Sequence, residues 1–166
     1  MELFLIRHAE AVDFARSEAE RSLTSEGRER FQASVRGLAS LGIAFDAIWH
    51  SPYMRAAQTA QICGELSSSA PQPCDELLQA PSQLLLKKLQ GVEGCLALVG
   101  HEPWMSELYA RLTTGDPAHA TGLPFGKGAV AWLRGSPAWR GMDLCGFIPP
   151  GVSRGLAAKS TSKDRR

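Results

Sequence analysis

Three short apolar segments, each followed by a polar junction and a helix-like pattern, constrain the fold of this chain most. They are Leu3–Ile6, Phe45–Trp49 and Cys95–Val99. Apolar runs of this length between turn signals are typical of strands buried on both faces of a sheet. Because a helical pattern follows each of them, the alternation predicts an α/β sandwich with a mostly parallel central sheet.

Apolar residues at spacings of three and four predict the intervening helices. The clearest series spans residues 24–41, with Thr24 as the expected N-cap and Gly42 as the expected stop. A second helix is expected after Ser51 and Pro52, a cap-like residue followed by proline. Weaker patterns predict two more helices and then two strands, at residues 82–89, 103–112, 129–133 and 142–148.

A chain of 166 residues without an internal repeat suits one domain, which we place at residues 1–150. From Gly151 the composition becomes polar and loses apolar periodicity. Segments of this kind bury too little apolar surface to offset the entropy of ordering. We therefore expect residues 151–166 to form a disordered tail.

Composition excludes several broad classes of function. A net charge of +1 gives no general reason to expect nucleic acid or acidic lipid as a partner. No apolar run approaches the length of a membrane span, and Arg7 interrupts the apolar start where a signal peptide would continue. The four cysteines lack paired spacing, so we expect reduced thiols in the cytoplasm and no zinc site. We assume a monomer.

Cationic or potentially cationic residues gather where the three predicted strands end. Arg7 and His8 follow the first strand, Arg55 lies just inside the helix after the second, and His101 follows the third. Because the carboxyl ends of parallel strands meet at one edge of a sheet, we expect these four side chains to lie together. Helix N-termini at the second and third junctions would also favour an anion. Phosphate fits such a site.

Arginine and histidine suit different roles in phosphoryl transfer. Arginine binds two phosphate oxygens through its planar fork, whereas histidine acts as a nucleophile or a donor near neutral pH. We expect neutral His8 to attack phosphorus, Arg7 and Arg55 to hold the phosphoryl oxygens, and His101 to donate to the transition state. This covalent route requires neither a metal nor a cofactor.

Three motifs carry a resemblance to the histidine phosphatase superfamily: residues 5–10 (LIRHAE), 51–60 (SPYMRAAQTA) and 99–101 (VGH). Residues 21–24 (RSLT) and 126–131 (GKGAVA) resemble its SixA branch of phosphohistidine phosphatases. The resemblance implies a three-layer α/β/α fold of the phosphoglycerate mutase type, with His8 as nucleophile and Arg7, Arg55 and His101 around the phosphate. It also implies a further basic position at Arg21.

The chain departs from the pattern of the superfamily at two positions. Ala9 follows the first histidine where many relatives have glycine, and His50 occupies a place where a small residue is common. Many members also place an acidic residue in the middle region to protonate the leaving group. Asp75 and Glu76 lie there without a clear motif, and the choice between them, or neither, stays open.

Without such an acid, phosphohistidine is the favoured substrate, because the nitrogen of its P–N bond accepts a proton more readily than an ester oxygen. The leading hypothesis is a phosphatase that removes phosphate from histidine on a phosphocarrier or signalling protein. Two alternatives remain: a general phosphatase for small phosphate monoesters, and a module that binds phosphoproteins without turnover.

Overall fold

One sheet with the strand order β3-β2-β4-β1-β5-β6 organises the computed structural model, which describes residues 1–123 and 125–163. The strands are β1 (Glu2–Arg7), β2 (Ala47–His50), β3 (Gln72–Pro73), β4 (Cys95–Gly100), β5 (Val130–Gly135) and β6 (Met142–Ile148). The first four run parallel, whereas β5 is antiparallel to β1 and β6 is antiparallel to β5. The predicted α/β class with a mostly parallel sheet is confirmed.

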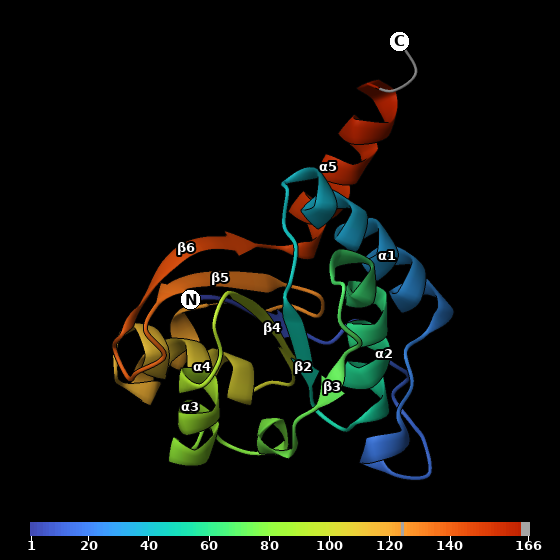
Figure 1. Ribbon diagram of the computed structural model, residues 1–166. Coiled ribbons are helices and arrows are strands. Elements are labelled where there is room, and N and C mark those ends of the chain that lie inside the picture. Colours follow the sequence, from blue (N-terminus) through green and yellow to red (C-terminus); the bar gives the residue numbers. More distant parts are fainter. Residues whose placement is uncertain (124, 164–166) are drawn as a thin grey trace.

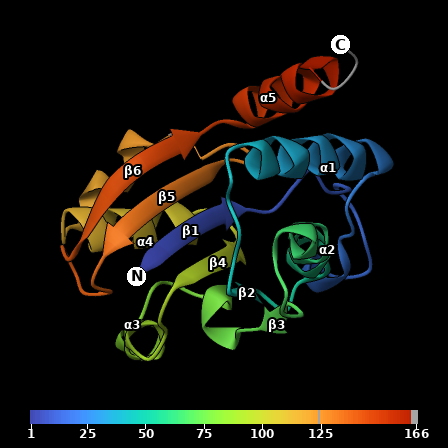
Figure 2. The ribbon, with the colours of Figure 1, turned by 45° about the horizontal axis from the view of Figure 1, so that its top comes forward.

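Helices cover both faces of this sheet (Figures 1 and 2). They are α1 (Ser25–Ser40), α2 (Met54–Cys63), α3 (Gln83–Gln90), α4 (Trp104–Thr113) and α5 (Pro150–Lys163). Short 3₁₀ segments lie at Glu18–Glu20, Gly64–Leu66, Asp75–Leu78 and Pro117–Gly122. No helix in the described part of the chain is long and apolar enough to cross a membrane.

Alternate residues of the central strands build two separate cores, as expected for a sheet buried on both faces. Phe4 and Ile6 of β1 pack with α1 and α2, including Phe31 of α1. Leu3 and Leu5 point to the opposite face and pack with apolar residues of α3 and α4. The result is three layers, with helices on either side of the sheet.

The predicted helix at residues 24–41 is confirmed as α1. The Thr24 hydroxyl accepts a hydrogen bond from the Gly27 amide at 2.9 Å and thereby caps the helix. The expected short helix at residues 82–89 is confirmed as α3, and Ser82 caps it in the same way.

The prediction of a disordered tail was wrong for residues 151–163, which form α5 together with Pro150. Residues 164–166 lie outside the described residues. Helix α5 packs along α1 and then extends away from the body of the molecule (Figures 1 and 2). Small residues make this contact, because Ser153 and Ala157 are buried and Gly37 of α1 lies against the Ser153 backbone. A helix that packs through small residues lacks the apolar periodicity from which sequence reasoning starts.

We expect Gly37→Ala to destabilise the protein by about 1–3 kcal/mol, the usual effect of overpacking a tight contact. A Cβ at residue 37 would overlap the carbonyl oxygen of Ser153, and a backbone atom has little freedom to move away. Urea unfolding measures the change. The control is Gly155→Ala on α5, where a Cβ meets nothing within 4 Å and the helix gains stability. Equal stability of the two variants would contradict the α1–α5 contact.

Candidate functional site

The parallel register of β1, β4 and β2 brings three chain segments together at one edge of the sheet. The His8 amide donates to the Gly100 carbonyl at 3.0 Å, and the Ser51 amide donates to the Val99 carbonyl at 2.9 Å. His101 directly follows Gly100. The residues that leave these three strands are therefore neighbours, as the sequence predicts for the ends of parallel strands.

His8 and His101 form a buried pair with ring centroids 5.2 Å apart, and each residue is only 6% exposed. His8 Nδ1 lies 2.7 Å from the carbonyl oxygen of Ala9, and Arg55 Nε donates to His8 Nε2 at 3.2 Å. One neutral tautomer satisfies both contacts, with the proton on Nδ1 and the lone pair on Nε2. In this tautomer the free lone pair of His8 is on Nε2, the nitrogen that faces Arg55.

Arg55 is 5% exposed and its guanidinium is held on several sides. Besides the contact with His8, its Nη1 donates to the backbone carbonyl of Glu18 at 2.7 Å, and its Nη2 lies 3.0 Å from Glu18 Oε1. The guanidinium also lies over the Tyr53 ring, 5.0 Å from its centroid. These contacts fix the plane of the guanidinium beside the histidine pair.

Two buried polar atoms of the site have no hydrogen-bond partner within the described residues: Arg7 Nε and His101 Nδ1. Each belongs to a side chain that is anchored elsewhere. Arg7 Nη1 donates to the Phe125 carbonyl at 2.6 Å, and His101 Nε2 lies 2.7 Å from Ser51 Oγ. Since buried polar atoms in folded proteins are nearly always paired, these two are suited to an anionic oxygen.

Burial is the main cause of low pKa values for both histidines. It lowers the pKa of His8 to about 4, assisted by the charges of Arg55, Arg7 and Lys127 and opposed by the hydrogen bond to Ala9. It lowers the pKa of His101 to about 3, assisted by Arg55, His8 and Arg7. Both rings are therefore neutral at pH 7. A bound phosphate would offset the arginine charges and favour a protonated His101.

The low pKa values predict that the folded protein loses stability in acid. His8 ordinarily titrates near 6.5, so its neutral form contributes stability fully above that pH, and this contribution is lost as the pH falls through about 4. At about 1.4 kcal/mol per pKa unit, His8 alone accounts for about 3 kcal/mol. Urea unfolding at pH 7 and pH 4 measures the loss, which we expect to be smaller by that amount in His8→Asn.

Exposed His119 supplies the control, because His119→Asn removes a histidine that is not part of the pair. It should show the same loss of stability in acid as the wild type. A His8→Asn variant with the same loss as the wild type would contradict the assignment of the low pKa to His8.

Arg21 reaches the site through a shared carboxylate. Its Nη1 donates to Glu18 Oε1 at 2.7 Å, and its Nε donates to the Val12 carbonyl at 2.7 Å. The same Glu18 oxygen contacts Arg55. The structure thus places Arg21 near Arg55, with Glu18 between the two guanidinium groups.

The two carboxylates considered as proton donors have other surroundings. Glu76 accepts from Lys88 Nζ at 2.8 Å and from Cys74 Sγ at 3.2 Å. The hydrogen bond from Lys88 is the main cause that lowers the pKa of Glu76. Because Glu76 is ionised at neutral pH and paired with Lys88, it is a poor proton donor. Within the described residues, none of the side-chain hydrogen bonds of His8 and His101 involves Asp75.

Sequence reasoning missed several supporting residues. Ser51 was expected to cap the second helix, but α2 begins at Met54 with Tyr53 as its N-cap, and the Ser51 hydroxyl instead contacts His101. Thr59 Oγ1 accepts from the Ala9 amide at 3.0 Å and donates to the Arg55 carbonyl at 2.6 Å. The position of Thr59 one helical turn after Arg55 was the sequence feature that could have identified it. Glu18 lies in a segment without regular periodicity, so no sequence pattern pointed to it.

Comparison with known sequences adds a family assignment. The model of the histidine phosphatase superfamily (branch 1) matches residues 3–79. An uncharacterized protein of Picosynechococcus sp. (strain ATCC 27264 / PCC 7002 / PR-6) is 32% identical over 83% of this chain and 87% of its own length. Phosphohistidine phosphatase SixA of Escherichia coli (strain K12) is 29% identical over 70% of this chain and 76% of its own length.

Comparison with solved structures shows the same fold. The protein histidine phosphatase SixA complexed with tungstate superposes with a TM-score of 0.77, at 22% identity, over 91% of this chain and 98% of the other. A phosphoserine phosphatase from Entamoeba histolytica in complex with 3-phosphoglyceric acid gives a TM-score of 0.71, at 17% identity, over 89% and 96%. The fold thus occurs in phosphatases named for different substrates and does not by itself select one.

Proposed function

The chain belongs to the histidine phosphatase superfamily, and on that premise we propose that it removes phosphate from phosphohistidine on a protein. The observation that carries this proposal is the neutral His8 ring. Its Nδ1 lies against the Ala9 carbonyl, and its Nε2 lone pair faces Arg55 next to His101. The similarity to SixA of Escherichia coli supports the choice of substrate.

The proposed reaction has two displacements at phosphorus. In the first, His8 Nε2 forms a bond to phosphorus while the P–N bond of the substrate breaks, and the substrate ring, already protonated on its other nitrogen, leaves as neutral imidazole. In the second, water attacks the phosphoryl group on His8 and releases inorganic phosphate, which restores the neutral ring. Arg7 and Arg55 hold the phosphoryl oxygens, and His101 donates a hydrogen bond to the developing charge.

The choice of a P–N bond rests on the leaving group. Departure of an alcohol requires a strong proton donor, whereas the nitrogen of phosphohistidine can itself be protonated before the bond breaks. Glu76 is held by Lys88 and its pKa is lowered, so this carboxylate does not suit the role of acid. The site has a nucleophile and cations, but Glu76 is engaged elsewhere. It therefore favours the imidazole of phosphohistidine, which leaves more easily than an alcohol.

The proposal includes no metal and takes a phosphorylated protein, such as a histidine phosphocarrier domain, as partner. Two guanidinium groups supply the positive charge that metal ions supply in many phosphoryl transfer enzymes. We therefore expect turnover to be unchanged by EDTA, and a fall in rate that added Mg²⁺ restores would contradict this part.

The test compares a phosphohistidine protein with an aryl phosphate, using acid-gentle mass spectrometry to follow label on His8. We expect kcat/KM for phosphohistidine to be at least about tenfold higher, with transient phosphate on His8. Equal or faster hydrolysis of the aryl phosphate would instead indicate a general phosphatase. Binding without turnover or label would indicate a phosphoprotein-binding module.

A further inference from the structure

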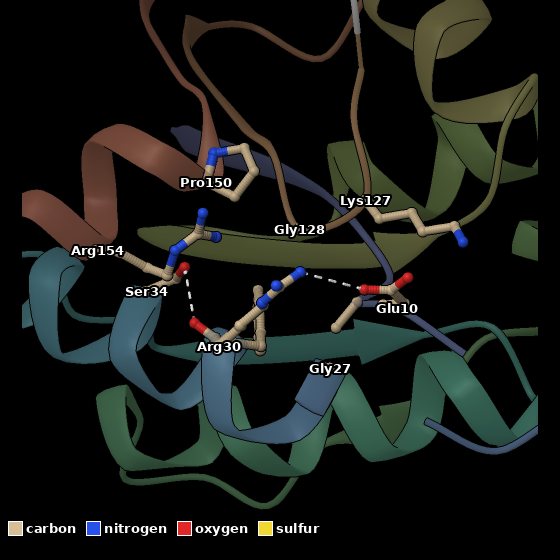
Figure 3. A pocket seen from close by; sticks show the side chains of 10 residues that line it. Glu10, Gly27, Arg30, Ser34, Lys127, Gly128, Pro150 and Arg154 are labelled. Atoms are coloured by element: carbon tan, nitrogen blue, oxygen red, sulfur yellow. Dashed lines mark hydrogen bonds and ion pairs between the residues drawn. The ribbon is translucent and has the colours of Figure 1, made fainter. Parts of the chain in front are cut away.

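A cavity of about 190 Å³ lies beside the loop that follows β1 (Figure 3). Its walls come from that loop, from α1, from the segment before β5 and from the start of α5. The residues that matter here are Ala9, Glu10, Arg30, Lys127, Gly128 and Arg154. Since the Glu10 and Arg30 side chains are about half exposed, the cavity is accessible from solvent.

The cavity adjoins the nucleophile without including the rest of the phosphate site. Ala9 is the residue after His8, and the Gly128 amide donates to the carbonyls of both Arg7 and His8, at 3.1 and 3.2 Å. Gly128 has a φ of 79°, a conformation that suits glycine and holds this turn against the end of β1. Neither Arg55 nor His101 lines the cavity.

Cationic side chains outnumber the single carboxylate of this cavity. Arg30 lies 3.6 Å from Glu10 and also pairs with Glu26. Arg154 lines the cavity from α5 and forms no ion pair with another described residue. Lys127 lines it from the segment before β5, with its ammonium group directed away from Arg154 (Figure 3). The walls therefore attract a further anionic group.

The volume of the cavity limits that group to about the size of one side chain. A carboxylate fits this space and can accept two hydrogen bonds from the Arg154 guanidinium. The loop that lines the cavity with Ala9 also carries His8, so the cavity lies next to the nucleophile. The two sites are thus arranged for two anionic groups of one molecule.

We propose that this cavity binds an aspartate or glutamate side chain of the phosphoprotein substrate, adjacent to the phosphorylated residue. This inference rests on the proposed function for the delivery of phosphate to His8. Arg154 is then a specificity residue, and α5 contributes directly to substrate choice.

The test uses four peptides of one scaffold, which carry phosphohistidine or phosphotyrosine and have either acidic or neutral residues beside it. We expect the wild type to favour the acidic flank by about tenfold in kcat/KM, and Arg154→Gln to reduce this preference to about twofold or less. The preference should also weaken in high salt. Turnover of p-nitrophenyl phosphate, which has no second anionic group, should change by less than about twofold in Arg154→Gln.

The matched control is Arg36→Gln, which removes an exposed arginine of α1 outside the cavity and should leave the flank preference intact. Peptide affinities measured calorimetrically in a His8→Ala background give the same comparison without turnover. Equal affinity for both flanks in the wild type, or an unchanged preference in Arg154→Gln, would overturn the inference. Faster hydrolysis of phosphotyrosine with the acidic preference retained would overturn the proposed function alone.

Discussion

Replacing His8 with alanine is expected to lower kcat by at least about 10³-fold for any substrate, because no other group replaces a lost covalent nucleophile. His8 Nε2 carries the lone pair that faces the cations, whereas its partner His101 is positioned through Ser51. Steady-state turnover of p-nitrophenyl phosphate and of a phosphohistidine protein measures the loss. The phosphate label on the protein should disappear as well.

Two controls separate lost chemistry from lost structure. His8→Asn keeps a polar group in the buried position, and circular dichroism with urea unfolding reports whether either variant folds. His119→Ala removes an exposed histidine and should retain full activity. If folded His8→Ala kept more than about a tenth of wild-type kcat, the nucleophile would have to be another residue.

Substitution of Arg55 by lysine is expected to lower kcat/KM by about 10²–10³-fold, although the positive charge is kept. The guanidinium donates in three directions, to His8 Nε2, to the Glu18 carbonyl and to the Glu18 carboxylate. A lysine ammonium is a point charge and cannot reproduce this planar arrangement. The variant therefore loses both the anchoring of the phosphoryl group and the orientation of the nucleophile.

The matched control for this substitution is Arg36→Lys, at an exposed position of α1, which should leave kcat/KM unchanged. Urea unfolding of Arg55→Lys reports any general loss of structure, and binding of inorganic phosphate reports the loss of anchoring. Wild-type kcat/KM in a folded Arg55→Lys variant would show that a point charge suffices at this position.

The edge of the sheet at which the site forms could be predicted from sequence, because buried strands are readable as apolar runs and parallel strands share a carboxyl edge. That reasoning placed His8, Arg55 and His101 together, and the structure does so. The same reasoning did not identify Glu18, because the contacts of Glu18 depend on how an irregular loop folds back over Arg55. Contacts made by an irregular loop leave no periodic pattern in the sequence.

The same limit explains the error at the C-terminus. Helix α5 is held by the close approach of Ser153 to Gly37, residues that are more than a hundred positions apart. Neither is apolar, so no amphipathic pattern marks the contact. Because Arg154 lies on this helix, the cationic wall of the cavity was missed together with the helix.

The hydroxyl of Thr59 joins the two halves of the site, since it accepts from the Ala9 amide and donates to the Arg55 carbonyl. Sequence changes in the loop after β1 and in the first turns of α2 therefore depend on one another during evolution. Serine would preserve this bridge, whereas valine, of similar shape, would leave the buried Ala9 amide without an acceptor. Substitutions on either side of the bridge should be epistatic, each changing the fitness effect of the other.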